Sequence, residues 1–156
     1  MGRRTVLLLC TGNSCRSIMS EALLRDRFGD RFDAYSAGTD PKGVHPMTIE
    51  VLNEIGIDTR ALRSKDVKEY LGKLWVNYLV VVCQSADQSC PRIFPGMVER
   101  FFWKFDDPPA FKGSDEEKLD KFREVRDQIA GEIETWVKEL EASGAVTTGG
   151  HLNETA

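Results

Sequence analysis

The chain has 156 residues, a formal net charge of −4 and a hydrophobic share of 41%. This length suits one domain with a well-buried core, and the acidic balance argues against nucleic acid as a partner. No apolar run approaches the ~20 residues of a membrane span, and the N-terminus lacks the long apolar segment of a signal peptide. We therefore expect a cytoplasmic monomer without membrane contact, in which local positive charge holds any anionic ligand.

The apolar pattern predicts strands that alternate with helices. Expected strands cover Thr5–Leu9, Asp33–Ala37, Tyr78–Val82 and Val98–Trp103, and expected helices cover Arg16–Phe28, residues 45–57 and a long amphipathic stretch from Asp115. This alternation predicts an α/β fold of three αβα layers around a four-stranded parallel sheet. We expect a single domain over residues 1–142 and a flexible tail over residues 143–156, because the tail has little to bury.

Three reactive groups follow predicted strands. Cys10, Cys83 and Asp107 each lie just after an apolar run. In open parallel sheets ligands bind past the carboxyl ends of the strands. We therefore expect these three side chains to converge on one edge of the sheet.

The stretch VLLLCTGNSCRS at residues 6–17 predicts an oxyanion cradle between the first strand and the first helix. Backbone N–H groups of such a turn and the helix N-terminus attract anions. Gly12 permits close backbone approach or positive φ, and Asn13 tolerates the left-handed region. The planar fork of Arg16 suits two oxygens of a tetrahedral anion. The predicted cradle consists of Thr11, Gly12, Asn13, Ser14, Cys15 and Arg16.

Cys10 lies at the base of this predicted cradle. The same positive field should lower its thiol pKa well below about 8.5 and yield a thiolate, which the Ser17 hydroxyl can stabilise as a leaving group. The alternative is a buried structural cysteine followed by a helix-capping serine. The Cys-x5-Arg-Ser pattern between an apolar strand and a helix favours a nucleophile. For Cys15 we expect a structural role, with its side chain turned away from the ligand.

The motif CTGNSCRS, the later SAGT at residues 36–39 and an Asp-Pro pair together resemble the low-molecular-weight protein tyrosine phosphatase fold family. The resemblance covers roughly residues 5–140. It implies that Cys10 is the nucleophile, that Arg16 is the oxyanion clamp and that an aspartate is the general acid. We favour Asp107 over Asp106 because the acid of this family directly precedes the proline.

The stretch VVVCQSADQSCPRIFP at residues 80–95 resembles the thioredoxin-coupled arsenate reductases, which share the phosphatase fold. This resemblance implies reduction of arsenate to arsenite through Cys10, Cys83 and Cys90, with thioredoxin as external reductant and no bound cofactor. Phosphate and sulfate would mimic arsenate. Pro109 and Ala110 follow the Asp-Pro pair, where phosphatases often carry aromatic residues, which argues mildly against an aryl phosphate substrate.

A disulfide between Cys83 and Cys90 sets a geometric condition. Residues seven apart on a straight helix lie ~10.5 Å apart along the axis. The Cα atoms of a disulfide lie about 4.4–6.8 Å apart. We therefore expect residues 83–90 to adopt different structures in the reduced and oxidised protein.

Several alternatives stay open at this point. The chain can be a tyrosine phosphatase in which Cys83 and Cys90 take no part in catalysis. It can also be an oxyanion or redox sensor without turnover. A zinc site is disfavoured because no Cys-x2-Cys spacing occurs. The reductases of this family can bind potassium through residues corresponding to Asn13, Glu21 and Ser36, but the stretch RSKD at residues 63–66 departs from the pattern of the remaining ligands. Its lysine and arginine argue against a bound cation.

Overall fold

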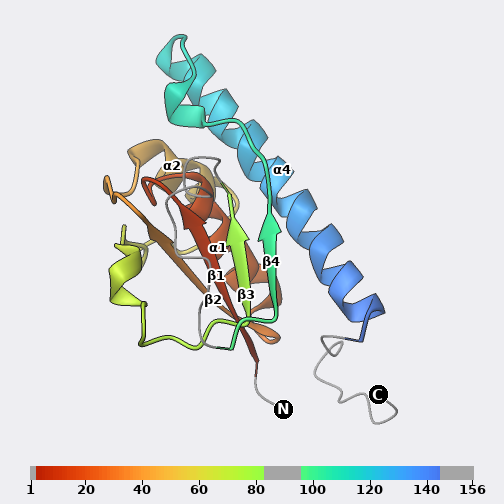
Figure 1. The fold of residues 1–156 in the computed structure, drawn as a ribbon. Coiled ribbons are helices and arrows are strands. Elements are labelled where there is room, and N and C mark those ends of the chain that lie inside the picture. The colour runs from red at the N-terminus through yellow and green to blue at the C-terminus, as the bar shows by residue number, and fades with distance from the viewer. Residues whose placement is uncertain (1–2, 83–95, 145–156) are drawn as a thin grey trace.

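The computed structural model describes residues 3–82 and 96–144. Four parallel strands form one sheet in the order β2-β1-β3-β4 (Figure 1). The strands are β1 (Arg4–Cys10), β2 (Phe32–Gly38), β3 (Tyr78–Val81) and β4 (Glu99–Phe102), the helices are α1 (Arg16–Phe28), α2 (Pro46–Glu54) and α4 (Asp115–Ala142), and two short 3-10 helices are η1 (Val67–Glu69) and η2 (Pro108–Ala110). The predicted α/β class and four-stranded parallel sheet are confirmed.

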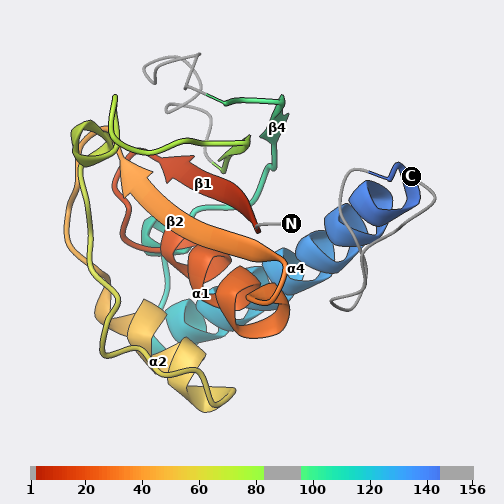
Figure 2. The ribbon, with the colours of Figure 1, turned by 90° about the horizontal axis from the view of Figure 1, so that it is seen from below.

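The three α-helices of the described chain lie on one face of the sheet (Figure 2). Trp136 of α4 anchors this face, since its ring lies 5.3–5.6 Å from the rings of four aromatic residues. These are Phe32, Tyr78, Phe101 and Trp103. On the second face Tyr35 of β2 meets Tyr70 at 5.5 Å. In the described part of the chain, η1 and the loop after it therefore cover this second face.

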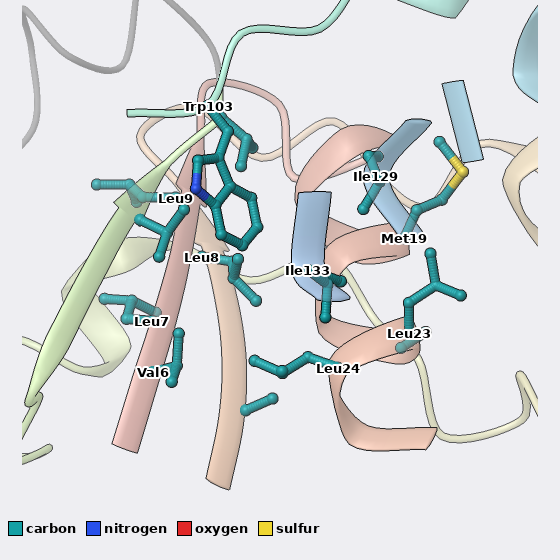
Figure 3. Close-up of a cluster of buried hydrophobic side chains, with 14 of the residues drawn as sticks. Val6, Leu7, Leu8, Leu9, Met19, Leu23, Leu24, Trp103, Ile129 and Ile133 are labelled. Atoms are coloured by element: carbon teal, nitrogen blue, oxygen red, sulfur yellow. The ribbon is translucent and has the colours of Figure 1, made fainter. Parts of the chain in front are cut away.

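The first strand is buried from Val6 to Leu9 without any exposed surface, as expected for a strand covered on both faces. Leu24 of α1 points toward the strands, whereas Met19 and Leu23 lie on the side of α1 that faces away from them (Figure 3). Each fully buried aliphatic side chain contributes about 1.5–3 kcal/mol, so the burial of Val6 to Leu9 fixes β1 firmly. The end of β1 is thereby a rigid platform for Cys10.

Local signals set most element boundaries. Ser114 and Glu117 form a capping box that starts α4, and Pro46 occupies the first turn of α2. Helix α2 ends at Glu54, three residues before the predicted end, because Gly56 takes a φ of 81° that a helix cannot continue. The sequence DDPP after β4 leads into η2, in agreement with the prediction that it cannot extend the sheet.

None of the helices in residues 3–82 and 96–144 is long and apolar enough to cross a membrane. The predicted flexible tail begins at residue 143, and residues 145–156 lie outside the described part, so the domain limits stay a prediction.

Candidate active site

A pocket of ≈ 570 Å³ opens at the carboxyl end of β1, where the chain turns into α1. Its wall combines the loop after β1 with two other loops, one before α2 and one after β4. The described residues that line it are Cys10, Thr11, Gly12, Ser14, Cys15, Arg16, Lys42, Gly43, Val44, His45, Pro46, Asp107 and Pro109. The predicted convergence of Cys10 and Asp107 on one edge of the sheet is therefore confirmed.

The carbonyl groups of the loop after β1 are held from outside by the segment that precedes α2. Backbone N–H groups of Thr39, Asp40, Lys42 and His45 donate to the carbonyls of residues 10, 11, 12 and 14. In a trans peptide the next N–H points opposite to the carbonyl, so the loop amides face away from this segment. Such an arrangement suits an oxyanion, and α1 adds the positive end of its dipole.

Asn13 takes the left-handed conformation of the loop, with a φ of 44°. Gly12 does not; its role is close approach, since an added Cβ would lie 3.3 Å from Cγ of Lys42. The Asn13 side chain is fully buried and donates to the hydroxyls of Ser17 at 2.8 Å and Ser36 at 3.0 Å. The buried side chain of Asn13 therefore stabilises the strained backbone conformation of the loop through its hydrogen bonds to Ser17 and Ser36.

The sulfur of Cys10 lies within reach of two donors. The backbone N–H of Asn13 donates to Sγ at 3.1 Å, and the Ser17 hydroxyl lies 2.9 Å from it. The contact between Cys10 and Ser17 is the one that the sequence predicted. Donors aimed at sulfur favour the thiolate, which is the nucleophilic form.

Arg16 projects into the pocket with its guanidinium held at both ends. One Nη donates to the carbonyl of Phe105 at 3.1 Å, and the other lies 3.5 Å from Oδ1 of Asp107. Asp106 instead binds Lys121 at 2.8 Å and is not part of the pocket wall. The geometry thus favours Asp107 over Asp106 as the acid beside the clamp.

The site thus combines a thiol at the base of an amide cradle with an arginine from the next helix and an aspartate from the loop after β4. The model of the low molecular weight phosphotyrosine protein phosphatase family matches residues 5–146. The chain belongs to this family. The fold family inferred from CTGNSCRS is therefore confirmed.

The similar solved structures carry two kinds of name, arsenate reductase and phosphatase; among the phosphatases, the YwlE arginine phosphatase from Geobacillus stearothermophilus has a TM-score of 0.72 and 22% identity, over 96% of this chain and 99% of that one. An arsenate reductase from Halalkalibacterium halodurans is 41% identical over 139 residues, which cover 88% of this chain and 98% of the relative. A thioredoxin-dependent arsenate reductase from Corynebacterium glutamicum is similar with a TM-score of 0.65 and 25% identity, over 90% of this chain and 63% of that one. The structure of an arsenate reductase in the phosphate binding state has a TM-score of 0.69 and 24% identity, over 87% and 98%.

The second cysteine of the family motif, Cys15, is buried and 3% exposed. Burial raises the pKa of its thiol to about 12, although a hydrogen bond with Thr48 opposes the shift. A thiol with this pKa stays protonated at neutral pH. Cys10 and Cys15 therefore differ in chemistry although they lie in the same loop.

The side chains of the predicted potassium site lie together, but a lysine accompanies them. Nζ of Lys65 is 3.4 Å from Oε1 of Glu21 and 3.3 Å from Oγ of Ser36, and its backbone N–H donates to Asn13 at 2.7 Å. An ammonium group therefore already supplies positive charge at this point. Within the described residues no group of three or more His, Cys, Asp or Glu side chains is placed to hold a metal ion.

Cys83 and Cys90 lie outside the described residues, and so does the predicted change of structure over residues 83–90. The residues that directly precede Cys10 and Cys83 are described. Val82 donates its N–H to the carbonyl of Leu9 at 2.9 Å, and both are fully buried. The two parallel strands β1 and β3 are thus neighbours up to the residues that directly precede Cys10 and Cys83.

Sequence reasoning missed the pocket residues that come from distant loops. Lys42 and His45 line the wall, and Lys65 lies behind the cradle. None of them belongs to a periodic pattern or a motif that the sequence displays. The departure of RSKD from the family's cation-binding pattern was the one available signal, and it marked Lys65 correctly as a competing charge.

Proposed function

We propose that this protein is an arsenate reductase that converts arsenate to arsenite through Cys10, Cys83 and Cys90, with thioredoxin as the external reductant and no bound cofactor. The observation that carries the proposal is the Cys10 sulfur, 3.1 Å from the Asn13 N–H and 2.9 Å from the Ser17 hydroxyl, at the base of an anion cradle. The names of its relatives support the same reaction.

The pocket favours a small inorganic anion over an aryl ester. Its described wall holds Lys42, Gly43, Val44 and Pro109, and among the described lining residues His45 is the one with an aromatic ring. Phe111, the nearest aromatic residue after the Asp-Pro pair, is not part of this wall. Arsenate, with phosphate or sulfate as mimics, fits a site whose described wall has no Phe, Tyr or Trp side chain to stack on a phenyl ring.

The first step forms a covalent adduct. The Cys10 thiolate attacks arsenic(V), an S–As bond forms and one As–O bond breaks, and Asp107 protonates the oxygen that leaves as water. Arg16 and the loop amides bind the remaining oxygens and balance their charge. The Ser17 hydroxyl stabilises the sulfur before attack and again when it leaves.

The second step transfers two electrons. The Cys83 thiolate attacks the Cys10 sulfur, an S–S bond forms, and the S–As pair of electrons stays on arsenic, which leaves as arsenite. Cys90 then attacks Cys83, which releases the Cys10 thiolate and leaves a Cys83–Cys90 disulfide. The dithiol of thioredoxin reduces this disulfide by ordinary exchange. The hydrogen bond from the Val82 N–H to the Leu9 carbonyl supports the approach, because these residues directly precede Cys83 and Cys10.

The test is arsenate-dependent NADPH oxidation with thioredoxin and thioredoxin reductase supplied. We expect Cys10→Ser, Cys83→Ser and Cys90→Ser each to abolish steady-state turnover, and Lys68→Met, an exposed change outside the pocket wall, to retain it as the control. Mass spectrometry of arsenate-treated protein should find bridges 10–83 and 83–90. Full turnover in Cys83→Ser or Cys90→Ser would overturn the relay.

Phosphate monoester hydrolysis is the alternative that the sequence left open, and it would use the same pair of Asp107 and Arg16. That reaction needs Cys10, Arg16 and the acid, and uses neither Cys83 nor Cys90. Hydrolysis of p-nitrophenyl phosphate that is lost in Cys10→Ser and kept in Cys83→Ser, without arsenate turnover, would identify a phosphatase. A single oxidation without continuing consumption of reductant would instead identify a sensor.

For the whole protein we keep three further predictions: a cytoplasmic location, a monomeric state and no nucleic-acid partner. The net charge of −4 supports the last of these.

A further inference from the structure

Lys65 is a buried lysine, with 5% of its surface exposed, behind the oxyanion cradle. Three oxygen atoms surround its Nζ: the carbonyl of Arg63 at 2.6 Å, the hydroxyl of Ser36 at 3.3 Å and Oε1 of Glu21 at 3.4 Å. An ammonium group has three N–H donors, so this set of acceptors matches its charged form. Burial lowers the pKa of Lys65, and the charge of Glu21 opposes that shift.

Glu21 is the buried anion of the same cluster, 4% exposed. Its Oε1 accepts from the Ser36 hydroxyl at 2.5 Å, and its Oε2 accepts from Arg25 at 2.8 Å. A buried carboxylate without a cation is strongly destabilising. The Arg25 side chain is about half exposed, so Lys65 is the buried cation that balances Glu21.

The cluster fixes the direction of a chain of hydrogen bonds. Ser36 has one hydroxyl proton and directs it to Glu21, so its oxygen accepts from Nδ2 of Asn13. The backbone N–H of Lys65 donates to Oδ1 of Asn13, which orients the amide. The second proton of Nδ2 then goes to the oxygen of Ser17. A Cys10 thiolate has no proton to donate, so in that state the Ser17 hydroxyl donates to the sulfur, 2.9 Å away.

We infer that Lys65 is a positioning residue: a tethered cation that, through Glu21, Ser36 and Asn13, positions the Ser17 hydroxyl that donates to the Cys10 thiolate. The inference rests on the role of Cys10 as nucleophile in the proposed function. It does not depend on whether arsenate is the substrate. Lys65 itself touches neither the sulfur nor the anion.

The readout is the alkylation of Cys10 by iodoacetamide, located by mass spectrometry in protein that carries Cys83→Ser and Cys90→Ser. We expect Lys65→Met to slow this alkylation about tenfold at pH 7, which corresponds to about one pKa unit. Lys68→Met is the matched control, because Lys68 is exposed and lies three residues away; it should keep the parent rate. In Lys65→Ala, added potassium or methylammonium ions should restore the rate to within about threefold of the parent.

A folded Lys65→Met protein that reacts at the parent rate would overturn the inference, as would a slowed Lys65→Ala protein that no cation rescues. If Lys65→Met does not fold, Ser36→Ala is the deciding variant. It interrupts the chain of hydrogen bonds between Glu21 and Asn13 but keeps the ion pair of Lys65 with Glu21. It should slow alkylation to a similar extent, and a parent rate would contradict the inference. Where both variants fold, the double variant should be no slower than either single one, because they act along one path.

Discussion

Oδ1 of Asp107 lies 3.5 Å from Nη2 of Arg16, so the two charged groups that flank the Cys10 sulfur are paired with each other. The other end of the guanidinium is fixed by the carbonyl of Phe105, which comes from the same loop as Asp107. An oxyanion that binds Arg16 must therefore compete with the acid for the guanidinium. The loop after β4 therefore contacts both ends of the Arg16 guanidinium.

The two neighbouring aspartates should differ sharply in effect. Asp107→Asn removes the acid and should lower the hydrolysis of p-nitrophenyl phosphate about a hundredfold or more, the usual contribution of a general acid. Asp106→Asn removes only an ion pair with Lys121 and should change the rate less than about twofold. Steady-state kinetics of both variants checks this. A larger loss in Asp106→Asn would assign the acid to the other residue.

The hydroxyl of Ser17 should contribute to the reactivity of Cys10. Ser17→Ala removes a donor to a charged sulfur, which is worth about 1.5–3 kcal/mol. Iodoacetamide should then alkylate Cys10 about tenfold or more slowly at neutral pH. Ser20→Ala is the control on the same helix, because the Ser20 hydroxyl donates to the Arg16 carbonyl at 2.7 Å. Equal rates in Ser17→Ala and the parent would show that the contact does not stabilise the thiolate.

The site illustrates which parts of a protein a sequence reveals. The stretch from Cys10 to Ser17 was predicted closely because a strand, a turn and a helix follow one another without interruption in the sequence. Gly12 and Asn13 are residue types that indicate a tight turn between the strand and the helix. Lys65 and His45 reach the site from separate loops whose positions depend on the whole fold. Asp107 was favoured over Asp106 from its place before the proline, and the ion pair of Asp106 with Lys121, which the local sequence does not indicate, agrees with that prediction.

The fold shows the same limit. Strands and helices were placed within a few residues, since apolar runs and capping residues are local. The packing of Trp136 against rings from three strands and the loop after β4 was not predicted, because it joins residues far apart in the chain.

Gly38 should be essential for the shape of the cradle. A Cβ at this position would lie 2.4 Å from the carbonyl oxygen of Thr11 and 3.0 Å from the backbone nitrogen of Asn13. Gly38→Ala must therefore shift the loop and should cost about 1–3 kcal/mol of folding free energy together with most of the activity. Gly131→Ala in α4 is the control, because nothing lies within 4 Å of its added Cβ. It should stabilise the protein by about 0.5–1 kcal/mol, as measured by urea unfolding.

Cys15 should resist reagents that modify Cys10. Its thiol has a pKa of about 12 because it is buried, so almost none of it is thiolate at pH 8. Brief treatment of the native protein with iodoacetamide should modify Cys10 and leave Cys15 intact, whereas treatment in guanidinium chloride should modify both. Peptide mass spectrometry distinguishes the two sites. Modification of Cys15 in the native protein at the rate of Cys10 would contradict this assignment.

His45 should make the folded state sensitive to mild acid. Its ring packs 4.8 Å from Phe122, and burial, aided by Lys118, lowers its pKa below the ordinary value of 6.5. The unfolded chain then binds more protons than the folded one as the pH falls through 6.5 toward the lowered pKa, so stability is lost in that window. His45→Asn keeps an acceptor for the Met47 N–H at the start of α2 but does not titrate. Between pH 7.5 and pH 5.5 the parent should therefore lose up to about 1 kcal/mol more than His45→Asn in urea unfolding. Parallel losses in the two proteins would show that His45 does not carry this pH dependence.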